Sequence, residues 1–299
     1  MRFKQFIAEN DGYSLDRITK EIKRNCKPFL DEANGEPIFR GIRAVDSIKI
    51  NPQPFNRMPK DSDSGFNFMF NAGTHLAFGI EAVRPKSFYV TGDWRQARAF
   101  GPLNFIFPIG EFSFMWSDSI DDSYEKSSNI YHQILDNLKV RGFSIYYVEL
   151  LFSYLAYRYE DYTVWMNEDY EKTQQTIINA LRANVAHYNE EGVESLAAVA
   201  VNKNFAQKLK AATKQAMKDL YSNNTNFYDA VKSKNEVAIT ESGGYYNIPV
   251  ALIADYIRKL PGNEKYDVID DFFGGSTEAA RGDIVDDHMY SYLLHLIAR

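Results

Sequence analysis

Segments with strand character stand on both sides of a long block of helical periodicity in this sequence. Between residues 121 and 220 the apolar residues recur at three-to-four spacing, which is typical of amphipathic helices. Short runs rich in aromatic and β-branched residues, typical of strands, lie at 38–42, 87–90, 104–109, 112–116, 236–239 and 245–248. This order predicts an α+β fold in which a helical block is inserted between the strands of one core.

Helices are also expected outside that block. Residues 14–30 carry Leu15, Ile18 and Ile22 at helical spacing, with Ser14 as N-cap and Pro28 near the end. The aromatic run Phe143–Tyr159 is interrupted by Glu149, so it is too polar for a bilayer and predicts a buried helix. The tail 249–299 is predicted to be mostly helical, with a polar, Gly-rich loop at 273–283.

Metal chemistry finds little support in the sequence. The five histidines form no i,i+4 pair, and Cys26, the one cysteine, excludes an internal disulfide and a thiolate metal cage. Residues 46–66 are predicted to be a loop, in which Asp61-Ser-Asp63-Ser-Gly65 faintly resembles a calcium loop. It lacks the glycine at position six and the closing glutamate, so a solvated turn is favoured and no metal is expected.

The net charge of −6 argues against broad binding to a phosphate backbone, which needs a basic face. A nucleic-acid partner is therefore not favoured, although the overall charge leaves a local basic patch open. A hydrophobic content of 45% excludes a disordered chain and predicts a packed globular protein.

The first nine residues, Met1–Glu9, are basic at the start, amphipathic in the middle, and end in Ile7-Ala8-Glu9. They are too short and too charged for the apolar region of a secretory signal. The block resembles the capsid-targeting leader of internal head proteins of T-even-type bacteriophages, which the prohead protease cleaves after such a glutamate. The resemblance implies cleavage after Glu9, a place inside the virion, and later delivery to the host cytoplasm. The alternative is an ordinary N-terminal helix.

Three widely spaced elements form a second pattern. They are Phe39-Arg40-Gly41 on a strand, the segment 88–93 followed by a helix that ends at Phe100-Gly101, and the strand that begins at Asn235-Glu236. Their order resembles the mono-ADP-ribosyltransferases of the Arg–Ser/Thr–Glu class, over residues 36–117 and 225–250. The resemblance implies a split, mostly antiparallel core within a single domain, 10–299, with the helical insert at about 121–222.

The resemblance also implies how NAD, the substrate that donates ADP-ribose, is held. Arg40 matches the arginine that grips the NAD phosphates, for which a planar guanidinium on a rigid strand is suited. Gly41 matches the position whose bare backbone lies against the nicotinamide carboxamide, and Phe100 the ring that stacks on nicotinamide. Tyr228 falls in the substrate-facing turn before the glutamate.

Glu236 matches the catalytic glutamate of this class, and Thr91 matches the middle hydroxyl of the Ser-Thr-Ser element that supports it. One carboxylate suffices, because nicotinamide leaves as a neutral molecule and the developing oxocarbenium cation needs a nearby negative charge. Two departures stand against the pattern. Val90-Thr91-Gly92 keeps one of three hydroxyls, and Lys234 replaces the Glu or Gln that orients the acceptor.

These patterns lead to one hypothesis and one alternative. The hypothesis is a phage internal virion protein, delivered to the host, that transfers ADP-ribose from NAD to a host macromolecule. The alternative is a non-catalytic internal head or host-takeover binding protein on a degenerate scaffold of the same kind. Each residue also has a plainer role: an arginine beside a glycine is often a surface ion pair, and Thr-Gly-Asp before a helix is a routine N-cap.

Overall fold

The computed structural model describes residues 15–43, 47–55, 63–81, 83–159, 161–185, 190–259 and 287–298, so the leader Met1–Glu9 lies outside the described residues. Helices and an antiparallel sheet are both present, which confirms the predicted α+β class. The chain divides into two compact units, each built from separate stretches. Unit 1 takes residues up to Gln53, Phe88–Phe114 and residues from Asn226 onward, and unit 2 takes Pro54–Ser87 and Met115–Thr225.

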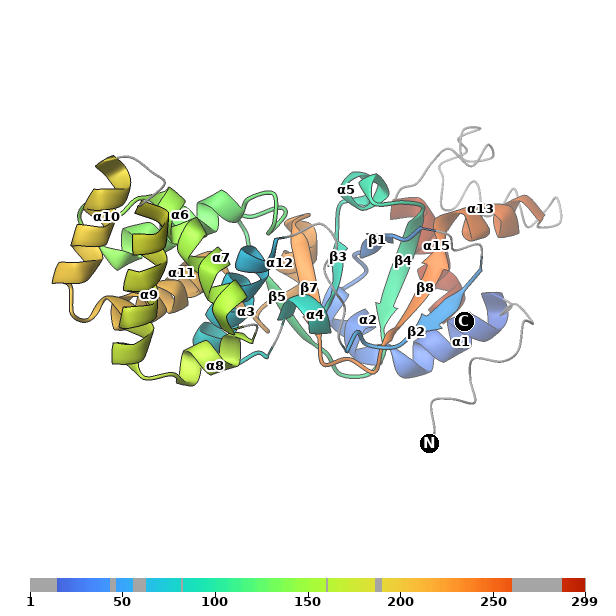
Figure 1. Cartoon of the computed structure of the whole chain (residues 1–299). Coiled ribbons are helices and arrows are strands. Elements are labelled where there is room, and N and C mark those ends of the chain that lie inside the picture. The colour runs from blue at the N-terminus through green and yellow to red at the C-terminus, as the bar shows by residue number, and fades with distance from the viewer. Residues whose placement is uncertain are drawn as a thin grey trace. The chain divides into compact units, whose positions relative to one another are not determined.

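The strands follow the order β2-β8-β4-β1-β3-β7-β5-β6, in which strands far apart in the sequence are neighbours. The pairs β1–β3, β1–β4, β2–β8, β3–β7, β4–β8 and β5–β6 are all antiparallel. β4 and β8 run side by side (Figure 1). The bounds are β1 Phe39–Gly41, β2 Lys49–Asn51, β3 Phe88–Thr91, β4 Leu103–Pro108, β5 Ser113–Trp116, β6 Ser222–Asn223, β7 Glu236–Thr240 and β8 Tyr245–Pro249.

Aromatic side chains join the sheet of unit 1 to its helices. Phe107 on β4 makes an edge contact with Phe29 and a stacked contact with Tyr290, and Phe105 also packs on Tyr290. All four rings are almost fully buried, so this group of rings forms the centre of the unit 1 core. The helices of unit 1 are α1 Leu15–Asn25, α2 Lys27–Ala33, α5 Trp94–Ala99, α12 Phe227–Lys232, α13 Val250–Lys259 and α15 Asp287–Ala298.

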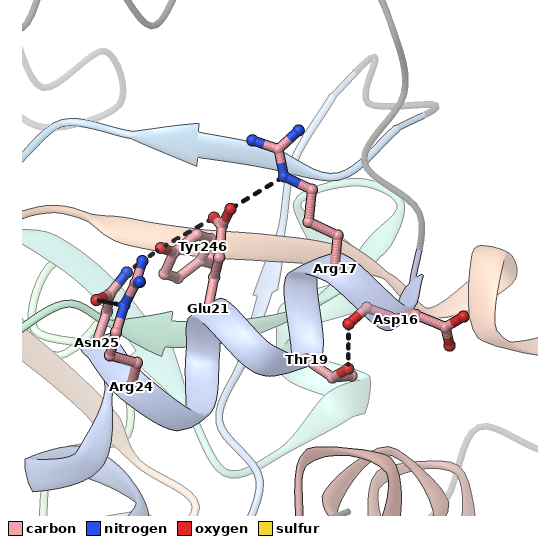
Figure 2. Close-up of polar contacts among 7 residues, drawn as sticks. All are labelled: Asp16, Arg17, Thr19, Glu21, Arg24, Asn25 and Tyr246. Carbon is pink, nitrogen blue, oxygen red and sulfur yellow. Dashed lines mark hydrogen bonds and ion pairs between the residues drawn. The ribbon is translucent and has the colours of Figure 1, made fainter.

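Polar contacts fix α1 on β8. The buried Tyr246 hydroxyl accepts a hydrogen bond from Asn25 Nδ2 at 2.7 Å and donates to Glu21 Oε2 at 3.5 Å. Figure 2 shows Glu21 and Asn25, one turn apart on α1, pointing toward that hydroxyl, with Arg17 paired to Glu21 at 3.2 Å. The position of α1 on the sheet is therefore set by hydrogen bonds as well as by its buried apolar face.

Unit 2 is mainly helical, and the predicted buried helix at Phe143–Tyr159 is α7, whose apolar face is buried. Two of its helix contacts are close because glycine is present: Gly65 on α3 lies against the backbone of Ser153 on α7, and Gly73 against Met217 on α11. No described helix has the length and apolarity needed to cross a membrane. The helices are α3 Ser64–Phe78, α4 Val83–Lys86, α6 Ser127–Leu138, α7 Ile145–Tyr159, α8 Tyr162–Asn167, α9 Tyr170–Val185, α10 Glu190–Val201 and α11 Phe205–Leu220.

The predicted loop at 46–66 contains more structure than its composition suggests. Strand β2 lies inside it, and α3 begins at Ser64. Asp63, part of the motif that faintly resembles a calcium loop, is the N-cap of α3, and its Oδ1 accepts a hydrogen bond from Phe66 N at 2.7 Å. Its carboxylate thus satisfies a free amide of the first helical turn.

Candidate functional site

Arg40, Thr91 and Glu236 lie on three strands that are consecutive in the sheet, β1, β3 and β7. Thr91 is the register partner of Glu236 on one side and of Phe39 on the other. Phe39 directly precedes Arg40, so the strand order brings the three predicted catalytic residues into one region of unit 1. This region, from β1 across β3 to β7, is the candidate site.

Side-chain direction separates Arg40 from the other two. The side chains of directly paired residues lie on one face of a sheet, and successive residues of a strand alternate between faces. Glu236 and Thr91 therefore share a face with Phe39, whereas Arg40 shares a face with its partner Asn104. If Arg40 and Glu236 act on one NAD molecule, their side chains are expected to face one cleft. The strand order brings the two residues near one another, but their side chains leave opposite faces of the sheet.

The Arg40 guanidinium is half-buried. Its Nη1 donates a hydrogen bond to the Tyr245 hydroxyl at 3.0 Å, and its Cζ lies 5.6 Å from the centroid of that ring. No carboxylate of the described segments forms an ion pair with it. Within those segments Arg40 therefore keeps most of its five N–H donors for a further acceptor, such as a phosphate.

Beside Arg40 lies a row of three asparagines that sequence reasoning missed. Asn51 Nδ2 donates to Asn247 Oδ1 at 2.5 Å, and Asn247 Nδ2 donates to Asn104 Oδ1 at 3.2 Å. Asn104 and Asn247 are both 0% exposed. The signal was an amide inside an otherwise apolar strand, as in Asn104-Phe-Ile-Phe and Tyr-Tyr-Asn247-Ile, because a buried amide needs a partner.

The packing of α5 on β1 brings the backbone of Phe100 next to Gly41. A Cβ on Gly41 would lie 2.0 Å from Ala97 O and 2.8 Å from Gly101 N, so only glycine allows this close approach. Phe100, the C-cap of α5, is 53% exposed. The packing of α5 is itself a reason for glycine at this position, and the exposed ring next to it is free to stack on a planar ligand.

Thr91 is held by the segment that precedes Glu236. Its Oγ1 donates to Lys234 O at 2.8 Å and accepts from Asp93 N at 2.9 Å. A hydroxyl has one proton, so Thr91 supports Glu236 through the backbone at Lys234 and does not donate to its carboxylate. Glu236 itself is half-buried at the start of β7.

Tyr228 lies on α12, eight residues before Glu236 in the sequence. Its hydroxyl accepts a hydrogen bond from Lys232 Nζ at 3.0 Å, and Lys232 Nζ lies 5.0 Å from the ring centroid. Lys232 is in turn 3.9 Å from Glu36 Oε1. These contacts hold Tyr228 to its own helix, and the structure shows no contact that joins it to Arg40 or Phe100 within the described residues.

Lys234 has a backbone φ of +64°, a left-handed conformation that is unfavourable for a residue with a Cβ. We expect Lys234→Gly to raise the free energy of unfolding by about 0.5–1 kcal/mol, because it relieves this strain while adding freedom to the unfolded chain. Urea denaturation followed by circular dichroism measures the change. Lys139→Gly, at φ +52° in unit 2, is the matched control and should stabilise similarly. Destabilisation by Lys234→Gly would show that the lysine side chain contributes more than the strain costs.

The surroundings of Cys26 are those of a core residue. Cys26 is fully buried, its Sγ lies 3.7 Å from Phe107 O, and burial raises the pKa of its thiol, which suits a packing residue and not a nucleophile. Within the described residues, no cluster of three or more His, Cys, Asp or Glu side chains is arranged to hold a metal ion.

Comparison of the chain with models of protein families, with curated proteins and with solved structures finds no match in any of the three.

Proposed function

We propose that the protein is an NAD-dependent mono-ADP-ribosyltransferase, carried inside a bacteriophage head and delivered to the host. The observation that carries the proposal is the register that aligns Phe39, Thr91 and Glu236 on β1, β3 and β7. Three motifs separated by long stretches of sequence, one of them beyond the helical insert, thereby meet on neighbouring strands. This strand order supports a site of the Arg–Ser/Thr–Glu class, because such a site needs its three motifs close together.

Arg40 binds the NAD phosphates in this proposal. The half-buried Arg40 guanidinium donates one hydrogen bond to the Tyr245 hydroxyl. Its other N–H groups can donate two parallel hydrogen bonds to a diphosphate. The exposed ring of Phe100 stacks on the nicotinamide, next to the backbone at Gly41. Tyr228 faces the substrate from α12. These residues bind and orient NAD, and the transfer step is assigned to Glu236.

In that step the bond between the ribose C1′ and the nicotinamide nitrogen breaks, and its electron pair leaves with neutral nicotinamide. The Glu236 carboxylate stabilises the positive charge that develops on the ribose and accepts a hydrogen bond from the 2′-hydroxyl. A nucleophile of the host macromolecule then bonds to C1′ and releases its proton to solvent. No metal is needed, because the leaving group is neutral and requires no Lewis acid.

Isothermal titration calorimetry with NAD tests the assignment of Arg40. We expect Arg40→Ala to weaken NAD binding by about 1.5–3 kcal/mol, since hydrogen bonds to charged groups are worth that much. Arg40→Lys keeps the charge but loses the planar fork, so it should recover part of the affinity. Arg258→Ala, which removes an arginine of α13 that is paired with Asp255, is the control and should bind NAD normally. Equal affinity in wild type and Arg40→Ala would remove Arg40 from the NAD site.

The first residue of protein taken from virions tests whether the protein is packaged and cleaved there. We expect protein extracted from mature virions to begin at Asn10, because the prohead protease cleaves after Ile7-Ala8-Glu9. Protein made without the protease should begin at Met1. N-terminal sequencing distinguishes the two, and Glu9→Ala is the control that should block cleavage. Virion protein that retains Met1–Glu9 would contradict the leader proposal while leaving the transferase proposal intact.

A second candidate is a non-catalytic binding protein on the same scaffold. It is favoured by the Thr91 hydroxyl, which donates to Lys234 O, and by Val90 and Gly92, which lack the other two hydroxyls of the family pattern. It is also favoured by the side chains of Arg40 and Glu236, which lie on opposite faces of the sheet. This candidate predicts binding to a host target with neither ADP-ribose transfer nor NAD hydrolysis, which a labelled-NAD assay on host extract detects.

A further inference from the structure

Three exposed arginines, none of them assigned to NAD, lie on α5 or beside Gly101, which follows its C-terminal end. Arg95 and Arg98 are three residues apart on α5, so their side chains share one face of the helix. Arg43 reaches the same end of α5 from the segment after β1. A Cβ on Gly101 would lie 3.1 Å from Arg43 N and 3.4 Å from Arg43 Cγ, which puts Arg43 against the residue that follows Phe100. We call Arg43, Arg95 and Arg98 the arginine surface.

The arginine surface carries a local positive charge in a chain whose net charge is −6. Its guanidiniums form no ion pair with a carboxylate of the described segments, whereas Arg17 and Arg258 elsewhere in unit 1 do. The acid nearest to Arg95 in sequence is Asp93, whose Oδ1 accepts a hydrogen bond from Arg95 N at 2.8 Å as the N-cap of α5. Among the residues that the structure describes, these guanidiniums therefore have no carboxylate partner, and planar guanidiniums suit phosphate groups.

Aromatic rings accompany these charges. The Arg95 guanidinium lies over the half-buried Trp94, with its Cζ 5.0 Å from the ring centroid. Phe100, at the end of the same helix, is one of the exposed large apolar side chains of the described residues. Guanidinium and aromatic planes on one surface are the arrangement on which unpaired bases stack while the backbone phosphates are neutralised. An acidic peptide carries negative charge but no bases, so it could pair with the guanidiniums but could not stack bases on the aromatic rings.

We propose that the arginine surface, with Trp94, binds single-stranded nucleic acid. Three arginines contact few phosphates, so the binding is local and does not require the strongly basic chain that the net charge of −6 excludes. A duplex is a poorer partner, because its bases are already stacked on one another. The site is independent of Glu236, and the proposal stands whether or not the protein transfers ADP-ribose.

Fluorescence anisotropy of labelled oligothymidylate, titrated with the full-length protein, tests this proposal. We expect Arg95→Gln combined with Arg98→Gln to weaken binding at least about tenfold and to flatten the dependence on salt by about 1.4 in the log–log slope, or about 0.7 for each lost phosphate contact. Arg17→Gln together with Arg258→Gln, which removes two arginines that already have carboxylate partners, is the matched control and should leave binding unchanged.

Three further binding measurements distinguish the possible ligands of the arginine surface. Labelled oligouridylate, compared with oligothymidylate, shows whether RNA or DNA binds more tightly. Either preference supports the proposal if the Arg95/Arg98 variant weakens binding. Labelled polyglutamate that binds as tightly as the oligonucleotides, with the same loss in the variant, would overturn it in favour of an acidic protein partner. Unchanged binding in the Arg95/Arg98 variant, or no binding by wild type, would also overturn it. Glu236→Gln should bind oligonucleotide like wild type, which separates this result from the fate of the transferase proposal.

Discussion

Glu236→Gln is expected to reduce ADP-ribose transfer by about 10²–10³-fold while leaving NAD affinity nearly unchanged. Glutamine keeps the shape and the capacity for hydrogen bonding of the side chain but removes the charge that stabilises the ribose cation. This decrease in rate corresponds to an increase of about 2.7–4 kcal/mol in the activation free energy. Because the substitution acts on the transition state, kcat should fall and KM should stay close to its wild-type value.

The measurement is transfer of labelled ADP-ribose from NAD to proteins and nucleic acids of a host extract, beside NAD hydrolysis. Glu241→Gln is the matched control, because Glu241 follows the far end of β7 and accepts a hydrogen bond from Ser113 at 2.9 Å. It should retain full activity. Glu236→Gln with wild-type turnover would exclude Glu236 as the catalytic carboxylate. A wild type without activity and without NAD binding would favour the non-catalytic candidate.

Gly41→Ala is expected to lower the free energy of unfolding by about 3 kcal/mol. The new methyl group would lie 2.0 Å from Ala97 O, 2.8 Å from Gly101 N and 3.0 Å from Phe100 C. All three are backbone atoms of α5 and its C-terminal end, so no side-chain rotation relieves the clash. Either α5 moves away from β1 or the alanine variant remains strained, and both outcomes displace Phe100 from its place next to the backbone at Gly41.

Urea denaturation measures the stability of the variant, and the emission of the nearby Trp94 reports on α5. Gly243→Ala is the control, since its Cβ would meet Ile109 at 3.2 Å, a contact that a small shift relieves. We expect it to cost less than about 1 kcal/mol. If Gly41→Ala proves as stable as wild type, the close approach of α5 to β1 is not maintained in solution.

The sequence pattern predicts the strands of unit 1 other than β2, because their apolar runs are short and bounded by turn residues. The close approach of α5 to Gly41, next to Phe100, is not part of the prediction from the sequence. Nor does the sequence pattern predict α3, whose Phe66, Phe68 and Phe70 alternate like the residues of a strand. That helix is buried on most sides, and a helix that is apolar all round has no amphipathic period by which to recognise it.

The details of the candidate site were less accessible to sequence reasoning. Whether Arg40 faces the same side as Glu236 depends on register, and a shift of one residue reverses the face of every side chain. Nothing local in Phe-Arg40-Gly fixes that register, because the partners on β3 and β4 lie far along the sequence. The asparagine row on β2, β8 and β4 likewise becomes visible only when the three strands are aligned.

The division of unit 1 into separate stretches has a consequence for the nascent chain. β1, β3 and β4 are synthesised before residue 115, but their partners β7 and β8 follow only after the whole of unit 2 has been made. During that interval β3 and β4 each expose an edge with unpaired amides and apolar side chains. Unit 2 therefore has time to fold on the ribosome while the sheet stays open. We expect a chaperone that acts during translation to bind these open strand edges.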